Sequence, residues 1–274
     1  MTIEDLLKLS LVDPLEAQVL LAHALKCTRV QLVIRNKDPL TPQQVTEISA
    51  LLMRRMQGEP IAYLTGEREF HGLRFEITPD VLIPRHETEL LVELGSEKLP
   101  KSGSVLDLGT GSGAIAVSLA HARRDAQVTA TDISQAALVV ARRNASAHAV
   151  SIQLVHSDWW DKVEGLFDVI VSNPPYIAAS DPHLLRGDLR FEPRTALTDE
   201  ANGMMHISAI IDGAARHLNP GGWLLIEHGY DQAAAVRALL QKSGWQHAQS
   251  WKDLAGIERV SGAVLEGNHA DKPL

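Results

Sequence analysis

The sequence predicts an α/β protein in which a small helical domain precedes a doubly wound, mostly parallel sheet. Residues 1–58 carry apolar side chains at helical spacing. Residues 86–266 alternate between β-branched stretches and helical stretches, and the first of these strands leads through a glycine-rich turn into a helix. This alternation is typical of parallel sheets, because the connection between two parallel strands crosses over the sheet and is usually helical.

The bulk composition is that of a globular protein without a membrane segment. The chain has 274 residues, 45% of them hydrophobic and 22% charged, and its acidic N-terminus lacks the features of a signal peptide. The net charge of −8 gives no general attraction to nucleic acid, and the single cysteine, Cys27, cannot form an internal disulfide. We therefore expect a cytoplasmic protein, a monomer, with no membrane or direct nucleic acid partner.

The first clear helix signal lies in residues 13–25. Asp13 is placed as its N-cap and Pro14 as its first residue. The apolar residues predicted to share its buried face are Leu15, Val19, Ala22 and Leu25.

A second helix is predicted over residues 41–56, where Thr41 and Gln44 are spaced for a capping box. Its predicted buried face consists of Val45, Ile48 and Leu52. The apolar faces of these two predicted helices need other apolar surfaces to pack against, so we expect residues 1–58 to form a small helical bundle.

After residue 58 the pattern predicts a connecting hairpin. Residues 59–85 mix aromatic and β-branched side chains around a turn at His71-Gly72. The second domain follows as residues 86–266, and the tail, 267–274, is expected to be disordered.

Within the second domain the strands and helices can be assigned in order. Helices are predicted at 87–99, 112–124, 134–148, 205–218 and 231–244. Seven strands are predicted at 104–109, 127–133, 151–158, 167–176, 222–229, 247–253 and 258–266. In such a sheet a ligand binds beyond the carboxyl ends of the strands, where the strand order reverses.

Three successive strand ends suggest a site for an adenosine compound. Gly109, Gly111 and Gly113 permit a tight turn and close approach of a ligand to the backbone. Asp132 ends the next strand, 19 residues after Gly113, where a carboxylate would bind ribose hydroxyls, although it could instead cap the following helix.

The third strand end is Asp158-Trp159-Trp160. Asp158 can accept from an exocyclic amine and Trp159 can pack on a purine ring, whereas Trp160 is better explained as part of the core edge. A P-loop is excluded because no Gly-Lys-Ser/Thr follows the glycines, but Gly109, Gly111 and Ala114 leave a nicotinamide dehydrogenase open as an alternative.

The strand over residues 167–176 ends in Asn173-Pro174-Pro175-Tyr176. We expect this strand beside the one that enters the glycine loop. The prolines hold an extended turn with free carbonyls, and the Asn173 side chain adds another acceptor. Together they would hold a planar NH₂ group, with Tyr176 lying against it.

With these motifs the chain resembles the bacterial peptide chain release factor glutamine methyltransferases, which belong to the S-adenosylmethionine-dependent methyltransferases. The resemblance covers residues 1 to about 265 and includes "GEPIAYLTGEREFHGLRFEITPDVLIPRHETELLVE", "DLGTGSG", "SDWW", "NPPYI", "DLRFEPRTAL" and "ERV". It implies a Rossmann-like methyltransferase domain with a seven-stranded sheet. It also implies methylation of the glutamine in the Gly-Gly-Gln loop of class 1 release factors, with S-adenosyl-L-methionine as cofactor.

The resemblance also implies roles for individual residues. Catalytic roles fall to Asn173, Pro174 and Tyr176, and the substrate glutamine would be held by Asn173, Pro174, Pro175 and Tyr176. Cofactor contacts would come from Gly109, Thr110, Gly111, Ser112, Gly113, Asp132, Trp159 and Asn173. We add Asp107 and Asp158 to this predicted set. The family commonly has proline where this chain has His86, so the role of that position stays open.

Several alternatives remain at this point. A methyltransferase for a ribosomal protein glutamine, or for adenine in DNA or RNA, could use the same four residues, because an exocyclic amine is also a planar NH₂ group. A dehydrogenase leaves residues 173–176 without a role, and a binding module without activity explains neither group of residues. No metal is predicted, because His23 and Cys27 lack further ligands.

Overall fold

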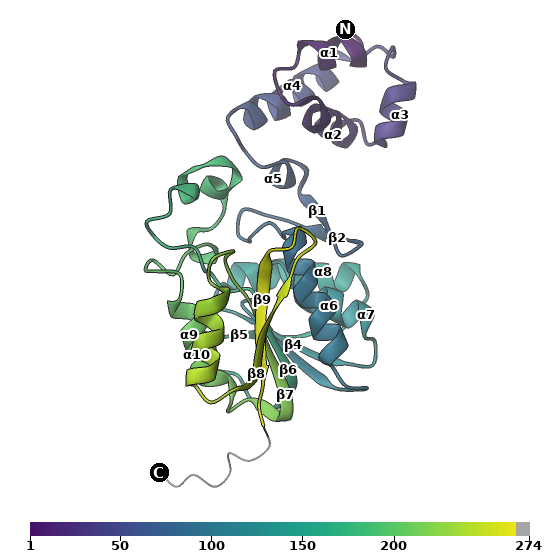
Figure 1. The fold of residues 1–274 in the computed structure, drawn as a ribbon. Helices are drawn as coiled ribbons and strands as arrows, with labels where there is room; N and C mark the ends of the chain where they lie inside the picture. Colours follow the sequence, from purple (N-terminus) through teal and green to yellow (C-terminus); the bar gives the residue numbers. More distant parts are fainter. Residues whose placement is uncertain (267–274) are drawn as a thin grey trace. The chain divides into compact units, whose positions relative to one another are not determined.

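The computed structural model describes residues 1–266 and divides them into two compact units (Figure 1). One unit is Met1–Glu67 together with Arg186–Phe191, and the other is formed by residues 68–185 and 192–266. The predicted disordered tail, 267–274, lies outside the described residues. Within residues 1–266, no helix has the length and apolar character needed to cross a membrane.

The first unit is a bundle of short helices, as the sequence predicts. Its helices are α1 (Ile3–Leu9), α2 (Pro14–Ala24), α3 (Arg29–Ile34), α4 (Pro42–Met56) and α5 (Ile61–Thr65). Asp13 caps α2 by accepting from two backbone N–H groups, and Thr41 and Gln44 form the expected reciprocal capping box on α4. The core of the unit contains Ile3, Leu6, Leu20, Leu21, Leu32, Ile48, Leu52 and Leu64.

The buried face of α2 differs from the prediction. Ala17, Leu20 and Leu21 are fully buried, whereas Leu15 is 52% exposed. This helix has apolar residues on nearly every side, so the spacing of its apolar residues does not determine which face is buried. The buried face of α2 is the one that contacts α3, α4 and α5.

The connecting segment contains a helix as well as the predicted hairpin. Strands β1 (Glu67–Phe70) and β2 (Leu73–Glu76) join at His71 and Gly72, whose φ angles of 50° and 73° suit a tight hairpin turn. Residues 61–65, which the prediction included in the hairpin segment 59–85, form α5. Pro60 precedes this helix, and Gly66 ends it in the left-handed conformation.

The second unit is built on a seven-stranded sheet with the order β5-β4-β3-β6-β7-β9-β8, in which β9 is antiparallel to its neighbours. The strands are β3 (Ser104–Leu108), β4 (Gln127–Asp132), β5 (Gln153–His156), β6 (Phe167–Ser172), β7 (Leu218–Glu227), β8 (Gln246–Lys252) and β9 (Glu258–Val264). The seven predicted strands and the mostly parallel arrangement are therefore confirmed.

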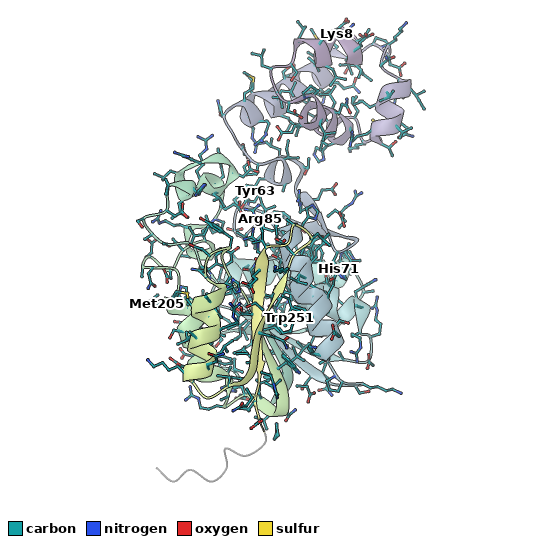
Figure 2. The ribbon with its side chains drawn as sticks, in the orientation of Figure 1. Lys8, Tyr63, His71, Arg85, Met205 and Trp251 are labelled. Carbon is teal, nitrogen blue, oxygen red and sulfur yellow. The ribbon has the colours of Figure 1, made fainter. Side chains whose placement is uncertain are left out.

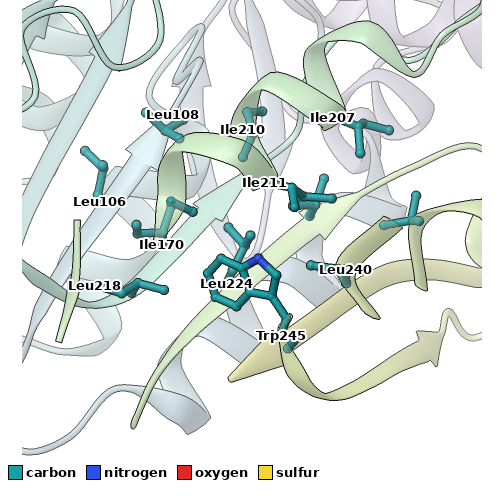
Figure 3. Close-up of a cluster of buried hydrophobic side chains, with 14 of the residues drawn as sticks. Leu106, Leu108, Ile170, Ile207, Ile210, Ile211, Leu218, Leu224, Leu240 and Trp245 are labelled. Atoms are coloured by element: carbon teal, nitrogen blue, oxygen red, sulfur yellow. The ribbon is translucent and has the colours of Figure 1, made fainter. Parts of the chain in front are cut away.

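Helices cover both faces of this sheet (Figure 1). One face carries α6 (Glu89–Lys98), α7 (Ala114–Ala122) and α8 (Gln135–Ala147), and the other carries α9 (Met205–Ala214) and α10 (Ala233–Lys242). Figure 3 shows the core under α9, where Ile207, Ile210 and Ile211 pack with Ile170 and Leu224 of the sheet. The ring centroids of Trp223 on β7 and Trp251 on β8 lie 5.9 Å apart, and Figure 2 labels Trp251.

Strand order reverses between β3 and β6, which pair in parallel as expected. Leu108 is the register partner of Ser172, whose hydroxyl donates to the Leu108 carbonyl over 2.8 Å. The glycine loop that follows β3 therefore begins beside the Asn173 turn that follows β6. This is the place where a doubly wound sheet binds its ligand.

Candidate active site

A cavity of about 520 Å³ opens in the second unit at the carboxyl ends of β3, β4, β5 and β6. Predicted site residues that line it are Gly109, Gly111, Asp132, Asp158, Trp159, Asn173 and Pro175. Predicted residues that do not line it are Asp107, Thr110, Ser112, Gly113, Pro174 and Tyr176. The cavity volume is within the range usual for small-ligand sites.

The glycine loop is fixed by bonds to the end of the next strand. The N–H groups of Gly109 and Thr110 both donate to the Thr131 carbonyl over 2.9 Å. Gly109, Gly111 and Gly113 all have positive φ angles, and a Cβ on Gly113 would lie 3.0 Å from that of Ala141 on α8. Gly113 thus permits close helix packing, while Gly109 and Gly111 present bare backbone to the cavity.

Asp107, near the end of β3, is a fully buried carboxyl group. Its Oδ2 accepts from the Thr110 hydroxyl over 2.6 Å, whereas Oδ1 is buried without a hydrogen-bond partner among the described residues. Burial raises the pKa of Asp107 to about 7, and the nearby charge of Asp132 adds to the shift. An unpaired buried carboxylate oxygen is costly unless a ligand, preferably a cation, satisfies it.

Asp132 connects β4 to the glycine loop. Its Oδ2 accepts from the Gly111 N–H and its Oδ1 from the Ser134 N–H, both over 2.8 Å. The N-cap of α8 is Ser134, which accepts from Ala137, so the alternative that Asp132 caps this helix is wrong. Burial raises the pKa of Asp132, and the residue lines the cavity as expected.

The two tryptophans after β5 have different surroundings, and only Trp159 lines the cavity. Trp159 lines the cavity with its ring centroid 5.2 Å from that of His206 and adopts a φ of 40°, which is rare outside glycine. Trp160 faces the core, where its indole N–H donates to the Ala209 carbonyl and its ring stacks on His217.

The residues after β6 form a hydrogen-bonded cluster. The Asn173 Nδ2 donates to the Thr88 hydroxyl over 3.2 Å, and the Tyr176 hydroxyl donates to Glu227 Oε1 over 3.3 Å. Burial, followed by the charge of Glu227, raises the pKa of Tyr176 above its ordinary value. Burial also raises the pKa of Glu227 to about 7, against the hydrogen bond from Tyr176, and its Oε2 has no hydrogen-bond partner among the described residues.

The long segment between β6 and α9, together with the first turn of α9, supplies cavity residues that sequence reasoning did not assign. From the segment they are Pro193, Thr195, Ala196, Thr198, Asp199 and Glu200, and from α9 they are Met205 and His206. Asp199 organises this wall by accepting from the N–H groups of Ala201, Gly203 and Met205. Burial opposes ionisation of Asp199, but these bonds leave its pKa below the ordinary value.

A second unassigned residue, Glu192, joins two of the sequence motifs. Its buried side chain accepts from the Ile83 N–H over 2.9 Å and from the Arg85 guanidinium group (Figure 2 labels Arg85). The segments "IPRHETE" and "FEPRTAL" are thereby held together beside the cavity. Both motifs were visible in the sequence, but the pairing between them was not.

His86, where the family pattern has proline, does not line the cavity. Its ring is 3.1 Å from Glu89, which also accepts from the N–H of His71 in the hairpin turn. The substitution therefore falls on an exposed helix start.

Known proteins similar to this chain are methyltransferases. Residues 4–66 match the PrmC N-terminal domain and residues 86–186 the methyltransferase small domain. The chain is 54% identical to the release factor glutamine methyltransferase of Burkholderia pseudomallei over 97% of both chains, and 50% identical to that of Bordetella pertussis over 95% of this chain and 99% of the other. A methyltransferase structure from Pyrococcus furiosus has a TM-score of 0.56 at 23% identity, over 80% of this chain and 100% of that one, and so shares the fold.

The raised pKa of Asp107 predicts a pH-dependent cost in the protein without ligand. Because the folded carboxyl binds its proton up to about pH 7 and an unfolded one only to pH 3.8, stability falls as pH rises between these values. Asp107→Asn removes this cost. At pH 8 it should raise the free energy of unfolding, measured by urea denaturation, by about 1–4 kcal/mol, with the gain shrinking towards pH 4.

The matched control is Asp125→Asn. Asp125 is exposed, and its hydrogen bond with Arg123 holds its pKa below the ordinary range, so this variant should not be stabilised at pH 8. Equal stability of Asp107→Asn and the unchanged protein at pH 8 would contradict an unpaired, buried carboxylate.

Proposed function

The chain belongs to the release factor glutamine methyltransferase family, and we propose that it transfers the methyl group of S-adenosylmethionine to the side-chain amide nitrogen of a release factor glutamine. The target we propose is the glutamine of the Gly-Gly-Gln loop in class 1 release factors. One observation supports the assignment of substrate binding to Asn173. Asn173 lines the cavity with its Nδ2 bonded to Thr88, which leaves its Oδ1 as an acceptor for a substrate N–H.

The cavity suits a cationic nucleoside cofactor. Bare backbone at Gly109 and Gly111, the acid Asp132 and the Asp158-Trp159 pair are the groups that would hold its ribose and adenine. Asp107, buried under the glycine loop without lining the cavity, places a carboxyl group close to it, which suits a positively charged part of the same molecule. When bound, this cofactor supplies an electrophilic methyl group on sulfur.

The protein's contribution to the reaction is orientation and acceptance of hydrogen bonds. A glutamine amide nitrogen is a poor nucleophile, because its lone pair is delocalised into the carbonyl group. As methyl transfer builds positive charge on that nitrogen, bonds from its two N–H groups to the Asn173 Oδ1 and the Pro174 carbonyl become stronger. Such differential stabilisation of the transition state, with orientation of the amide, lowers the barrier.

No strong base is required beside the nitrogen. After methylation the cationic amide is acidic and loses its proton to water. Glu227 is only 1% exposed and accepts from the Tyr176 hydroxyl, so we assign it no direct proton transfer. The same acceptors would serve an exocyclic amine, but the relatives at about half identity are named for release factors.

We propose that the helical unit recognises the protein substrate, because an amide site is too small to select a whole protein. Exposed apolar residues on α3 support this: Val30 is 69%, Val33 63% and Ile34 76% exposed. They lie at i, i+3 and i+4 and so share one face of the helix. Release factors act in translation, which also supports a cytoplasmic location.

The experiment that tests the function is transfer of labelled methyl from S-adenosylmethionine to purified release factor. A release factor with the loop glutamine changed to alanine is the control. Label on the first protein and none on the second establishes reaction and target. Label on neither, with S-adenosylhomocysteine but not NAD raising the melting temperature, would direct the search to a ribosomal protein or nucleic acid.

Asn173→Ala should separate catalysis from cofactor binding. Loss of the amide acceptor is expected to lower kcat at least about 100-fold while changing the cofactor Kd, measured calorimetrically, by less than about threefold. Asn36→Ala, in the helical unit, is the control and should leave both values unchanged. Equal loss of kcat and cofactor affinity would assign Asn173 mainly to the cofactor.

The double variant Val30→Ser/Val33→Ser tests the helical unit as the docking surface. We expect KM for the intact release factor to rise about tenfold with kcat nearly unchanged, since about 1–2 kcal/mol of apolar contact is lost. Val139→Ser, which changes a partly exposed valine on α8, is the matched control. An unchanged KM for the double variant would remove α3 from the docking surface.

A further inference from the structure

We propose that Gln232 and Gly203 are positioning residues that hold the Asn173–Tyr176 turn, and with it the substrate acceptors, in place against the cavity wall. Neither residue lines the cavity, and neither was assigned a role from the sequence. The inference rests on the proposed function, because it explains how the acceptors of that reaction are kept in position.

The turn is held at its last residue, Tyr176. The backbone carbonyl of Tyr176 accepts from Gln232 Nε2 over 3.0 Å, and its phenol donates to Glu227 Oε1 over 3.3 Å. Both partners belong to one short stretch of chain, since Glu227 ends β7 and Gln232 directly precedes α10. The connection between β7 and α10 therefore fixes Tyr176 by its backbone and by its side chain.

The direction of the Gln232 side-chain amide is determined by its backbone partners. Its Oε1 accepts from the Gly229 N–H over 2.8 Å, and its Nε2 donates to the carbonyls of Tyr176 and Gly203 over 3.0 and 3.3 Å. A backbone N–H can only donate and a carbonyl can only accept, so a reversed amide would lose all three bonds. Gln232 thus joins the β7–α10 connection, the turn after β6 and the segment before α9.

Gly203 brings the cavity wall against the same carbonyl. Its N–H donates to the Asp199 carboxylate over 2.9 Å, and Asp199 lines the cavity. Gly203 is buried with a φ of 80°, and a Cβ at this position would overlap the Tyr176 carbonyl oxygen. The position therefore needs glycine for two reasons, which are its left-handed backbone and its close approach to Tyr176.

A stiff piece of chain connects Tyr176 to the substrate acceptors. Pro174 and Pro175, whose rings fix their φ angles, lie between Tyr176 and Asn173. A displaced Tyr176 carbonyl therefore carries the Pro174 carbonyl and the Asn173 side chain with it. Since a misplacement of about 1 Å can cost about 100-fold in rate, the support of Tyr176 affects catalysis from outside the cavity.

The experiment compares Gln232→Met with Gln232→Glu in the full-length protein at pH 8, measuring kcat with release factor and the Kd of S-adenosylhomocysteine. Methionine keeps the length of the side chain and loses all three bonds. Ionised glutamate keeps an acceptor for the Gly229 N–H but has no hydrogen to donate to the two carbonyls. We expect kcat to fall about 10- to 100-fold in both variants, with the cofactor Kd changed less than about threefold.

Gly203→Ala tests the other side of the Tyr176 carbonyl, with Gly256→Ala as its matched control. The two glycines have nearly the same φ angles, 80° and 79°, but a Cβ at Gly256 meets open space. The strain of a left-handed alanine is therefore common to both variants, and only the overlap with Tyr176 differs. At saturating cofactor we expect Gly203→Ala to lower kcat about 10- to 100-fold and Gly256→Ala to leave it unchanged.

The opposing outcomes are distinct. Full kcat in either Gln232 variant would overturn the inference, and full kcat in Gln232→Glu alone would assign the residue to the β7–α10 connection. Equal loss in Gly203→Ala and Gly256→Ala would overturn it by marking a general effect of strain. Loss of cofactor affinity in parallel with kcat in the Gln232 variants would also overturn it. Absence of methyl transfer by the unchanged protein would instead contradict the proposed function.

Discussion

The parallel pairing of β3 with β6 is the constraint on which the site depends. It places the glycine loop and the Asn173 turn side by side, with Leu108 opposite Ser172 and a side-chain bond between them. Since side chains alternate across a sheet, a slip of one residue would move every side chain of β6 to the opposite face. Both faces of β6 are apolar, with Val169, Ile170 and Val171 fully buried, so the close packing on each face and the hydrogen bond from Ser172 to Leu108 fix its register.

Two buried carboxyl groups carry much of the electrostatic character of the second unit. Asp107 and Glu227 are almost fully enclosed, and burial raises the pKa of each to about 7. Each also has one oxygen without a partner among residues 1–266. Burying a carboxyl group with an unpaired oxygen costs free energy, so fold stability alone does not explain either residue.

Much of the fold could be predicted from local signals, while several tertiary choices could not. Capping at Asp13 and Thr41, the seven strands and the roles of Asp132 and Trp159 as cavity residues all follow from short-range patterns. The buried face of α2 depends on the neighbours that surround it. Thr88 and Asn173 are far apart in sequence, and only the packing of the segment before α6 against the Asn173 turn brings them into hydrogen-bond contact.

A pair of acceptors for NH₂ recognises a planar nitrogen but does not identify the molecule that carries it. Glutamine amides and exocyclic base amines offer the same two N–H groups, so the Asn173 turn alone allows both substrates. Charge argues against a nucleic acid, because the chain carries a net charge of −8 and phosphate binding depends on accumulated positive charge. The exposed valines of α3 suit an apolar protein surface instead. Under the function proposed above, the strand ends determine the chemistry, and surfaces outside the sheet select the macromolecule.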